Sequence, residues 1–183
     1  MADTKLHGQH DASPALYELV SRGFVRTATN VAAQAVSAAL ATTYTGLCIS
    51  NPAGSGVNLV MLGAQYVLSV APVAIAPLFL IAGFSTAGVV THTTPLAAPG
   101  IQSALINGSS TSAAKADSAC TIVNPYYLLP LGSGFTAGAL YGTTPAWIDL
   151  AGMFVIPPGG WIAWGALSAA TGLGGFAWAE FPI

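Results

Sequence analysis

The spacing of apolar residues near the N-terminus predicts one short amphipathic helix. Ser13 and Pro14 form a start signal, because serine is a favoured N-cap and proline fits the first helical position. Glu18 and Arg22 stand four residues apart, which is the spacing of an ion pair along a helix. We therefore expect a helix over residues 13–26. Its apolar face at helical spacing comprises Leu16, Leu19, Val20 and Phe24.

The rest of the chain has the pattern of a β protein. Residues 30–43 are rich in alanine and are compatible with a continued helix or with the first extended element, and intrinsic propensity slightly favours the helix. From Thr42 onward, short apolar segments alternate with turn signals built from Pro, Gly, Asn and Ser. Residues 93–118 have the composition of a long surface loop. The expected strands are 44–50, 57–69, 75–82, 88–92, 119–123, 126–131, 134–140, 147–156, 161–167 and 175–181.

This series of short strands predicts an all-β fold, with a jelly-roll β-sandwich ahead of an immunoglobulin-like one. We expect an N-terminal arm with the amphipathic helix over residues 1–41 and the jelly-roll domain over residues 42–183. Residues 1–12 are polar and lack periodicity, which indicates a flexible tail or a tail that a partner orders.

The expected strand 57–69 is apolar on both faces. One face carries Val60, Leu62, Ala64, Tyr66 and Leu68, and the other carries Val57, Leu59, Met61 and Val67. A strand with two apolar faces is buried on both sides. We therefore expect one face in the core and the other in contact with something else.

Charged residues are absent from 88 consecutive positions, Thr27 to Ala114, and the chain has only ten in 183 residues. A soluble globular chain carries about a quarter. Because charge keeps the surface of a monomer soluble and apart from its neighbours, lipid or other protein is the expected surrounding of this chain. Nucleic acid is not an expected partner, since phosphate binding needs clustered Lys and Arg and this chain has four in all.

Residues 66–84 are the strongest candidate for a membrane span, with 19 uncharged residues. Pro72 and Pro77 lie within this segment, and each removes a helical hydrogen bond. No Lys or Arg flanks the segment to set its orientation. These features favour protein over lipid, and a small integral membrane protein stays as an alternative interpretation.

Cys48 and Cys120 lie among apolar or β-branched residues, which favours two buried free thiols. A disulfide between them would need an oxidising compartment. The start of the sequence lacks the apolar segment of a secretory signal, so we expect the chain to be made in a reducing cytosol.

The chemically reactive residues do not predict an enzyme, a metal site or a cofactor site. His7 and His10 lack the further ligands that close a metal site. A Ser–His–Asp triad would need His92 with Asp117 or Asp149, and no nucleophile motif accompanies them. We therefore expect a protein that is not an enzyme and has no cofactor.

All four tryptophans lie in the last 37 residues, and their clustering favours a place in the sandwich core. The alternative is that one or two of them anchor a partner, since aromatic residues dominate binding hot spots. A carbohydrate platform would need nearby acids and amides, which are scarce here. The four are Trp147, Trp161, Trp164 and Trp178.

Two parts of the chain resemble small structural proteins of tailed bacteriophages. The first is residues 45–62, TGLCISNPAGSGVNLVML, in which an NP-x-G-S turn would link the first two strands of a jelly roll. The second is FVIPPGGWIAW at 154–164 with GFAWAEFP at 175–182, which is similar to the closing hairpin of such domains. In texture, residues 45–183 resemble a trimeric capsid cement, or decoration, protein with an N-terminal arm.

The resemblance implies a homotrimer that binds the major capsid protein on the surface of the virion, after synthesis in the host cytoplasm. In a trimer, one outer sheet face of each subunit is covered by its neighbours, which removes the need for charge there. The N-terminal arm would bind the capsid, and the residues expected to do so are Leu16, Leu19, Arg22, Phe24 and Arg26. The alternative with the same fold is a phage fibre or receptor-binding module that contacts a glycan through residues 93–118 or through the tryptophans.

Overall fold

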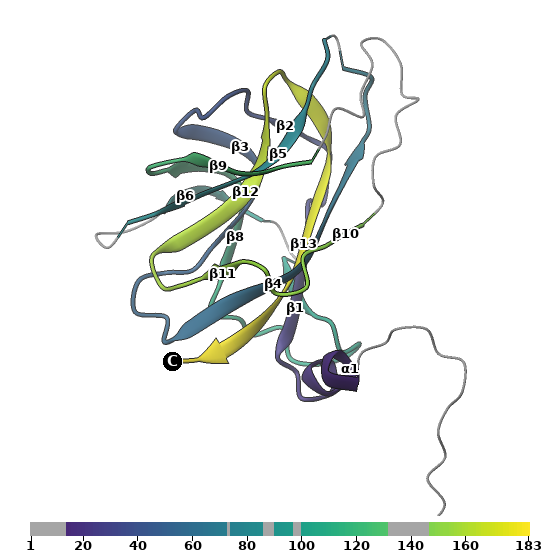
Figure 1. Ribbon diagram of the computed structural model, residues 1–183, viewed down its shortest axis with the longest axis vertical. Helices are drawn as coiled ribbons and strands as arrows, with labels where there is room; N and C mark the ends of the chain where they lie inside the picture. The colour runs from purple at the N-terminus through teal and green to yellow at the C-terminus, as the bar shows by residue number, and fades with distance from the viewer. Residues whose placement is uncertain (1–13, 73, 86–89, 97–99, 132–146) are drawn as a thin grey trace, which may run out of the picture.

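A computed structural model describes residues 14–72, 74–85, 90–96, 100–131 and 147–183, and these form two antiparallel β-sheets with one short helix. The sheets pack as a β-sandwich, so the predicted all-β sandwich fold is confirmed. The helix, α1 (Pro14–Ser21), lies at one end of the sandwich, beside β1 (Figure 1).

The first sheet, sheet A, has seven strands in the order β10-β4-β13-β1-β7, and in addition β11 pairs with β4 and β2 pairs with β13. Its strands are β1 (Val25–Thr29), β2 (Gln34–Val36), β4 (Val57–Leu68), β7 (Ile101–Ser103), β10 (Ile148–Asp149), β11 (Val155–Ile156) and β13 (Ala170–Pro182).

The second sheet, sheet B, has six strands in the order β6-β8-β3-β12-β5-β9. Its strands are β3 (Thr43–Ser50), β5 (Leu78–Phe84), β6 (Val90–Pro95), β8 (Lys115–Ile122), β9 (Tyr126–Pro130) and β12 (Gly160–Ala166).

The chain crosses repeatedly between the two sheets. It passes from β3 in sheet B to β4 in sheet A and back to β5, and later from β9 through β10 and β11 to β12 and then β13. These crossings bring distant parts of the sequence together, so β1 lies beside β13 with Val25 opposite Ala179.

The core between the sheets is built around buried aromatic rings. Trp164 of β12 is fully buried, and its ring centroid lies 5.6 Å from that of Phe176 in β13 and 5.3 Å from that of Tyr66 in β4. Trp161 and Trp178 are also buried, whereas Trp147 is 53% exposed. The predicted core position is therefore confirmed for three of the four tryptophans.

The long strand β4 is apolar on both faces, as predicted, but the predicted membership of the faces is wrong, because a bulge at Leu62 shifts the alternation and puts Ala64 and Tyr66 on the core face. Leu59 and Met61 are fully buried in the core. Val60 and Val67 alternate with the core residues and lie on the outer face of sheet A, half-buried and 41% exposed respectively. The core contact of β4 is therefore present within one chain, and a molecule that covers its outer face stays a prediction.

Helix α1 is shorter than predicted and ends at Ser21 rather than at residue 26. Gly23 adopts a positive φ of 74° after the last turn. The amide of Phe24 donates to the carbonyl of Leu19 at 3.0 Å, and the amide of Gly23 donates to that of Val20 at 2.9 Å. This pair of bonds is a Schellman motif, in which glycine ends a helix because it tolerates the left-handed conformation.

Residues 25–36 of the predicted arm lie within sheet A. β1 pairs with β13 on one side and β7 on the other, and β2 pairs with β13. The helical interpretation of residues 30–43 is therefore wrong, and the extended alternative holds over β2. Packing against β13 outweighs the weak helical propensity of the alanines here, as tertiary context commonly does.

Three further sequence predictions differ from the structure. The expected strand 147–156 is divided into β10 and β11 by a turn with positive φ at Ala151 and Gly152. The expected loop 93–118 contains the end of β6, all of β7 and the start of β8. The expected strand 88–92 continues as far as Pro95 in β6. Within residues 66–84, the end of β4 and all of β5 lie where strands 57–69 and 75–82 were expected, and the spanning helix of the alternative interpretation is not formed by the described positions. The expected strand 134–140 lies outside the described residues.

Candidate partner-binding surfaces

An exposed ion pair joins helix α1 to the residue that follows it. Arg22 Nη2 lies 2.6 Å from Glu18 Oε1, and both side chains are more than half exposed. Exposed pairs of this kind contribute little to stability, so both charges can exchange this contact for one with a partner. Tyr17 on the same helix is 73% exposed.

An apolar cavity of about 690 Å³ lies between α1 and sheet A. It opens to solvent, since Leu16 and Trp147 in its lining are 41% and 53% exposed. Asp149 is the one charged residue among the described residues that line it. The lining residues are Ala15, Leu16, Leu19, Val20, Val25, Thr27, Leu62, Ala104, Trp147, Asp149, Ala151 and Ala177.

The structure places three of the five predicted capsid-binding residues on α1 or directly after it. Leu16 and Leu19 line the cavity, and Leu16 is 41% exposed. Arg22 follows the last turn of the helix on the solvent side. These three side chains are close enough in sequence and position to form one contact surface.

The other two predicted residues have partners within the chain. The ring of Phe24 stacks on that of Phe181 in β13, with centroids 6.0 Å apart. Arg26 lies in β1, and its guanidinium donates to the carbonyls of Gly23 and Thr111. Both side chains tie the start of the sheet to neighbouring segments, and any capsid contact that they make would come in addition to these bonds.

The outer face of sheet A away from α1 carries no charged residue in β1, β4 or β13. The side chains of this outer face belong to the residues that alternate along each strand with the residues pointing into the core. We call this surface the neutral face. It comprises Thr29, Val60, Gln65, Val67 and Leu173, which are half-buried or exposed.

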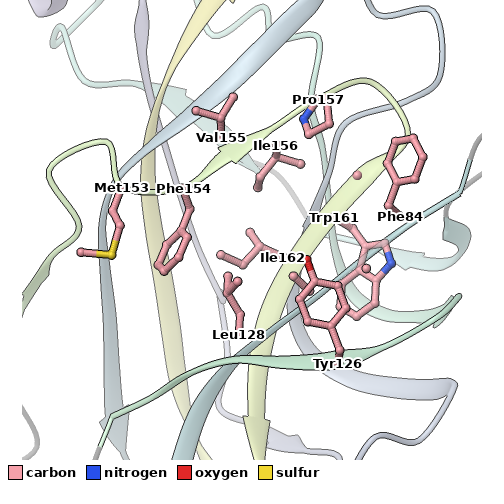
Figure 2. A pocket seen from close by; sticks show the side chains of 13 residues that line it. Phe84, Tyr126, Leu128, Met153, Phe154, Val155, Ile156, Pro157, Trp161 and Ile162 are labelled. Atoms are coloured by element: carbon pink, nitrogen blue, oxygen red, sulfur yellow. The ribbon is translucent and has the colours of Figure 1, made fainter.

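A second apolar cavity, of about 350 Å³, opens between the edges of the two sheets (Figure 2). One wall comes from β9 and the end of β5 in sheet B, and the other comes from β11 and the residues beside it. Phe84, Tyr126, Met153 and Val155 are each about half exposed or more at its mouth. We call it the edge groove, and it is lined by Ala82, Gly83, Phe84, Tyr126, Leu128, Met153, Phe154, Val155, Ile156, Pro157, Gly160, Trp161 and Ile162.

His92 and Asp117 form the one described pair that resembles part of a catalytic triad. His92 Nδ1 lies 2.6 Å from Asp117 Oδ2, and the Asp117 side chain is fully buried while that of His92 is 38% exposed. The other carboxylate oxygen, Oδ1, is buried without a hydrogen-bond partner. Ser118, the serine next to Asp117, donates its hydroxyl to the carbonyl of Thr94. This bond engages the Ser118 hydroxyl away from His92.

Burial raises the pKa of the Asp117 carboxyl above its ordinary value of 3.8, although the hydrogen bond and charge of His92 and the charge of Lys115 act the other way. A raised folded-state pKa means that the stability contributed by this group is complete below the unfolded pKa and is lost as pH rises through the folded one. We therefore expect the wild-type protein to lose stability relative to Asp117→Asn as the pH is raised from about 4. Urea unfolding of both proteins across this pH range measures the difference.

Asp149→Asn is the control, because it removes an equal charge from an exposed position. The groups that face Asp117 are His92 from β6, Lys115 from β8 and the Cys48 thiol from β3. A difference between wild type and Asp117→Asn that does not change with pH would contradict the prediction.

The two cysteines are free and buried, as the sequence predicted. Cys48 lies opposite Asp117, and Cys120 lies opposite Tyr44 at the other side of a bulge. Burial raises the pKa of the Cys48 thiol well above its ordinary value. The Cys48 thiol is therefore kept in the unreactive, protonated form.

Metal ligands and membrane-spanning helices can be sought only in the residues that the structure describes. Within them, no three His, Cys, Asp or Glu side chains converge on a metal position. None of the helices that the structure describes is long and apolar enough to cross a membrane. His7 and His10 lie outside the described residues.

Comparison with known proteins gives no matching family model, no matching curated protein and no matching solved structure. The resemblance to phage proteins therefore rests on residues 45–62, 154–164 and 175–182 alone.

Proposed function

We propose that this chain is a structural virion protein of a tailed bacteriophage, a cement or decoration protein that binds the outside of the capsid. It stabilises the shell by bridging neighbouring capsomers and uses binding energy alone, without a cofactor. Its partners are two further copies of itself, in a homotrimer, and the major capsid protein. It is made in the host cytoplasm and works at the capsid surface, with neither nucleic acid nor membrane as a partner.

The observation that carries the proposal is the uncharged surface that both sheets present. The neutral face and the edge groove contain no charged side chain, and large apolar side chains project from them. Exposed apolar patches of this kind mark sites of protein contact. A protein that spends its working life packed among other subunits needs little charge on such surfaces.

The strand order supports the jelly-roll part of the proposal. Jelly rolls consist of two sheets whose strands are connected across the sandwich in Greek-key fashion. Here β3, β4 and β5 alternate between the sheets, β11, β12 and β13 alternate again, and the first strand lies beside the last. A trimer of such sandwiches has neighbours against which the neutral face is buried.

Helix α1 supports the capsid-binding part. Its exposed charged pair offers polar contacts next to an open apolar cavity that an apolar side chain of the partner fills. Charged groups at the rim of an interface give specificity and orientation more than affinity. This combination suits a protein that recognises one position on a repeated shell.

The fibre or receptor-binding alternative is less well supported. Trp161, Trp164 and Trp178 are buried and cannot stack on a glycan, which leaves Trp147 as the exposed one. Part of the expected contact loop 93–118 forms β7 in sheet A and the start of β8 in sheet B, so that part is not a free loop.

The experiment that separates these functions is a count of copies in purified phage particles by quantitative mass spectrometry. We expect hundreds of copies per particle, in a fixed ratio to the major capsid protein. A handful of copies would instead indicate a tail or fibre protein and would overturn the proposal.

A second arm of the same experiment tests α1. Removal of residues 1–22 leaves Phe24 on Phe181 and Arg26 in β1, so the sandwich is expected to fold and shell binding to be lost. Ile106→Glu, at a position 90% exposed in another loop, is the control that should bind normally. Normal binding of the truncated chain would move the capsid contact to the sandwich.

A further inference from the structure

The edge groove exposes more apolar surface than a solitary subunit needs. Met153 is 69% exposed, Val155 is 51% exposed and Tyr126 is 50% exposed, all around one opening (Figure 2). The adjoining strand β9 is an edge strand, and it carries no charged residue. Proteins that stay monomeric usually protect such edges with lysine or other charges.

We propose that the edge groove is a subunit contact between copies of this chain and that it receives the neutral face of the next copy. The inference rests on the homotrimer in the proposed function and names the two surfaces that form it. Each subunit then uses its groove toward one neighbour and its neutral face toward the other.

Charge is the reason for choosing a second copy as the occupant. About a quarter of the residues of an average protein are charged, and a charge pressed against an uncharged groove loses its hydration without gaining a partner. The neutral face consists of the apolar residues Val60, Val67 and Leu173 and the uncharged polar residues Thr29 and Gln65. This chain therefore supplies in itself a surface that the groove can cover without that cost.

The two surfaces are continuous through β4. Val155 of the groove lies in β11, which pairs directly with β4 and places it opposite Val60 of the neutral face. Along β11, one uncharged surface thus runs around the edge of sheet A from the groove to the outer face, while Asp149 lies farther along the same edge in β10. Because groove and face are different surfaces, their contact is head-to-tail, and such contacts form a closed ring when the rotation between subunits allows it.

Pairing of β9 with β9 of a second copy would give a different assembly. Such pairing is isologous and gives a dimer. β9 has only five residues, ends at Pro130 and follows Pro125, and proline cannot donate to a ladder of backbone hydrogen bonds. The short, proline-bounded strand favours the groove over the strand edge as the contact.

The test uses the full-length chain with a charge placed on either surface. Met153→Glu blocks the groove and Val67→Glu blocks the neutral face, and both positions are exposed enough to accept the new side chain without unfolding. We expect the wild type to sediment as a trimer and each variant as an 18.3 kDa monomer with an unchanged circular dichroism spectrum. Ile106→Glu, which is 90% exposed and outside both surfaces, should stay trimeric.

A mixture of the two variants tests whether the contact is head-to-tail. The Met153→Glu chain keeps a working neutral face, and the Val67→Glu chain keeps a working groove, so an equimolar mixture should form a 1:1 heterodimer. Trimers in both single variants, a dimeric or monomeric wild type, or a mixture that stays monomeric would each overturn the inference. Hundreds of copies per particle with a monomeric wild type would overturn this inference and leave the decoration function standing.

Discussion

Replacement of Trp164 by alanine is expected to lower the free energy of unfolding by about 3–5 kcal/mol, the usual cost of removing a fully buried large aromatic side chain. Trp164 is fully buried between the sheets and contacts the rings of Phe176 and Tyr66. Its removal leaves a cavity, because the rigid rings of Phe176 and Tyr66 cannot change shape to fill the space. Since domains of this size are stable by about 5–15 kcal/mol, the loss is a large share of the total.

Urea unfolding followed by circular dichroism measures this loss. Trp147→Ala is the comparison variant, because Trp147 is 53% exposed, so that it has about half as much buried surface to lose and its removal is expected to cost clearly less than that of Trp164. Equal losses in the two variants would show that Trp164 is not the centre of the core.

Replacement of Asn51 by leucine is expected to cost about 1–3 kcal/mol, since it removes the side-chain donor from the buried carbonyl of Ile156 and leaves the carbonyl of Val57 with the longer bond from Ser55 Oγ at 3.4 Å. Asn51 is fully buried, and its Nδ2 donates to the carbonyl of Val57 at 2.8 Å and to that of Ile156 at 2.9 Å. The Asn51 side chain thus joins the end of β3 to the start of β4 and to the end of β11. Leucine has a similar volume and cannot replace either bond.

The adjacent Ser50→Ala variant is the control for this prediction. Ser50 is buried, but its hydroxyl has no hydrogen-bond partner, so its loss should leave the free energy of unfolding nearly unchanged. The loss of stability in each variant is measured by comparing its urea midpoint with that of the wild type. A stability of Asn51→Leu close to that of Ser50→Ala would contradict the prediction.

The parts of the fold that depend on local signals could be predicted from the sequence. Turn clusters such as 51–56 set the strand boundaries, and the two apolar faces of 57–69 predicted a long central strand. Gly23 was a readable stop signal for α1, yet the apolar spacing continued past it to Phe24 and extended the predicted helix. The burial of three tryptophans also followed from the clustering of all four near the end of the sequence.

The candidate surfaces depend on contacts between distant residues and could not be predicted. His92 and Asp117 are 25 residues apart and meet only because β6 pairs with β8. The edge groove combines side chains of four strands from both sheets. β1 was missed because its pairing partner β13 comes from the far end of the chain, and nothing local signals that partner.

The position of β13 also has a consequence for how the protein forms during synthesis. β13 pairs with β1, β2 and β4, and the amide of Gly174 donates to the Asn30 side chain across 144 residues of sequence. Sheet A therefore cannot assemble on a growing chain until residues 170–182 have left the ribosome. Folds dominated by such distant pairings fold slowly, in milliseconds to seconds. The neutral face, which β1, β4 and β13 form together, is likewise incomplete until that point.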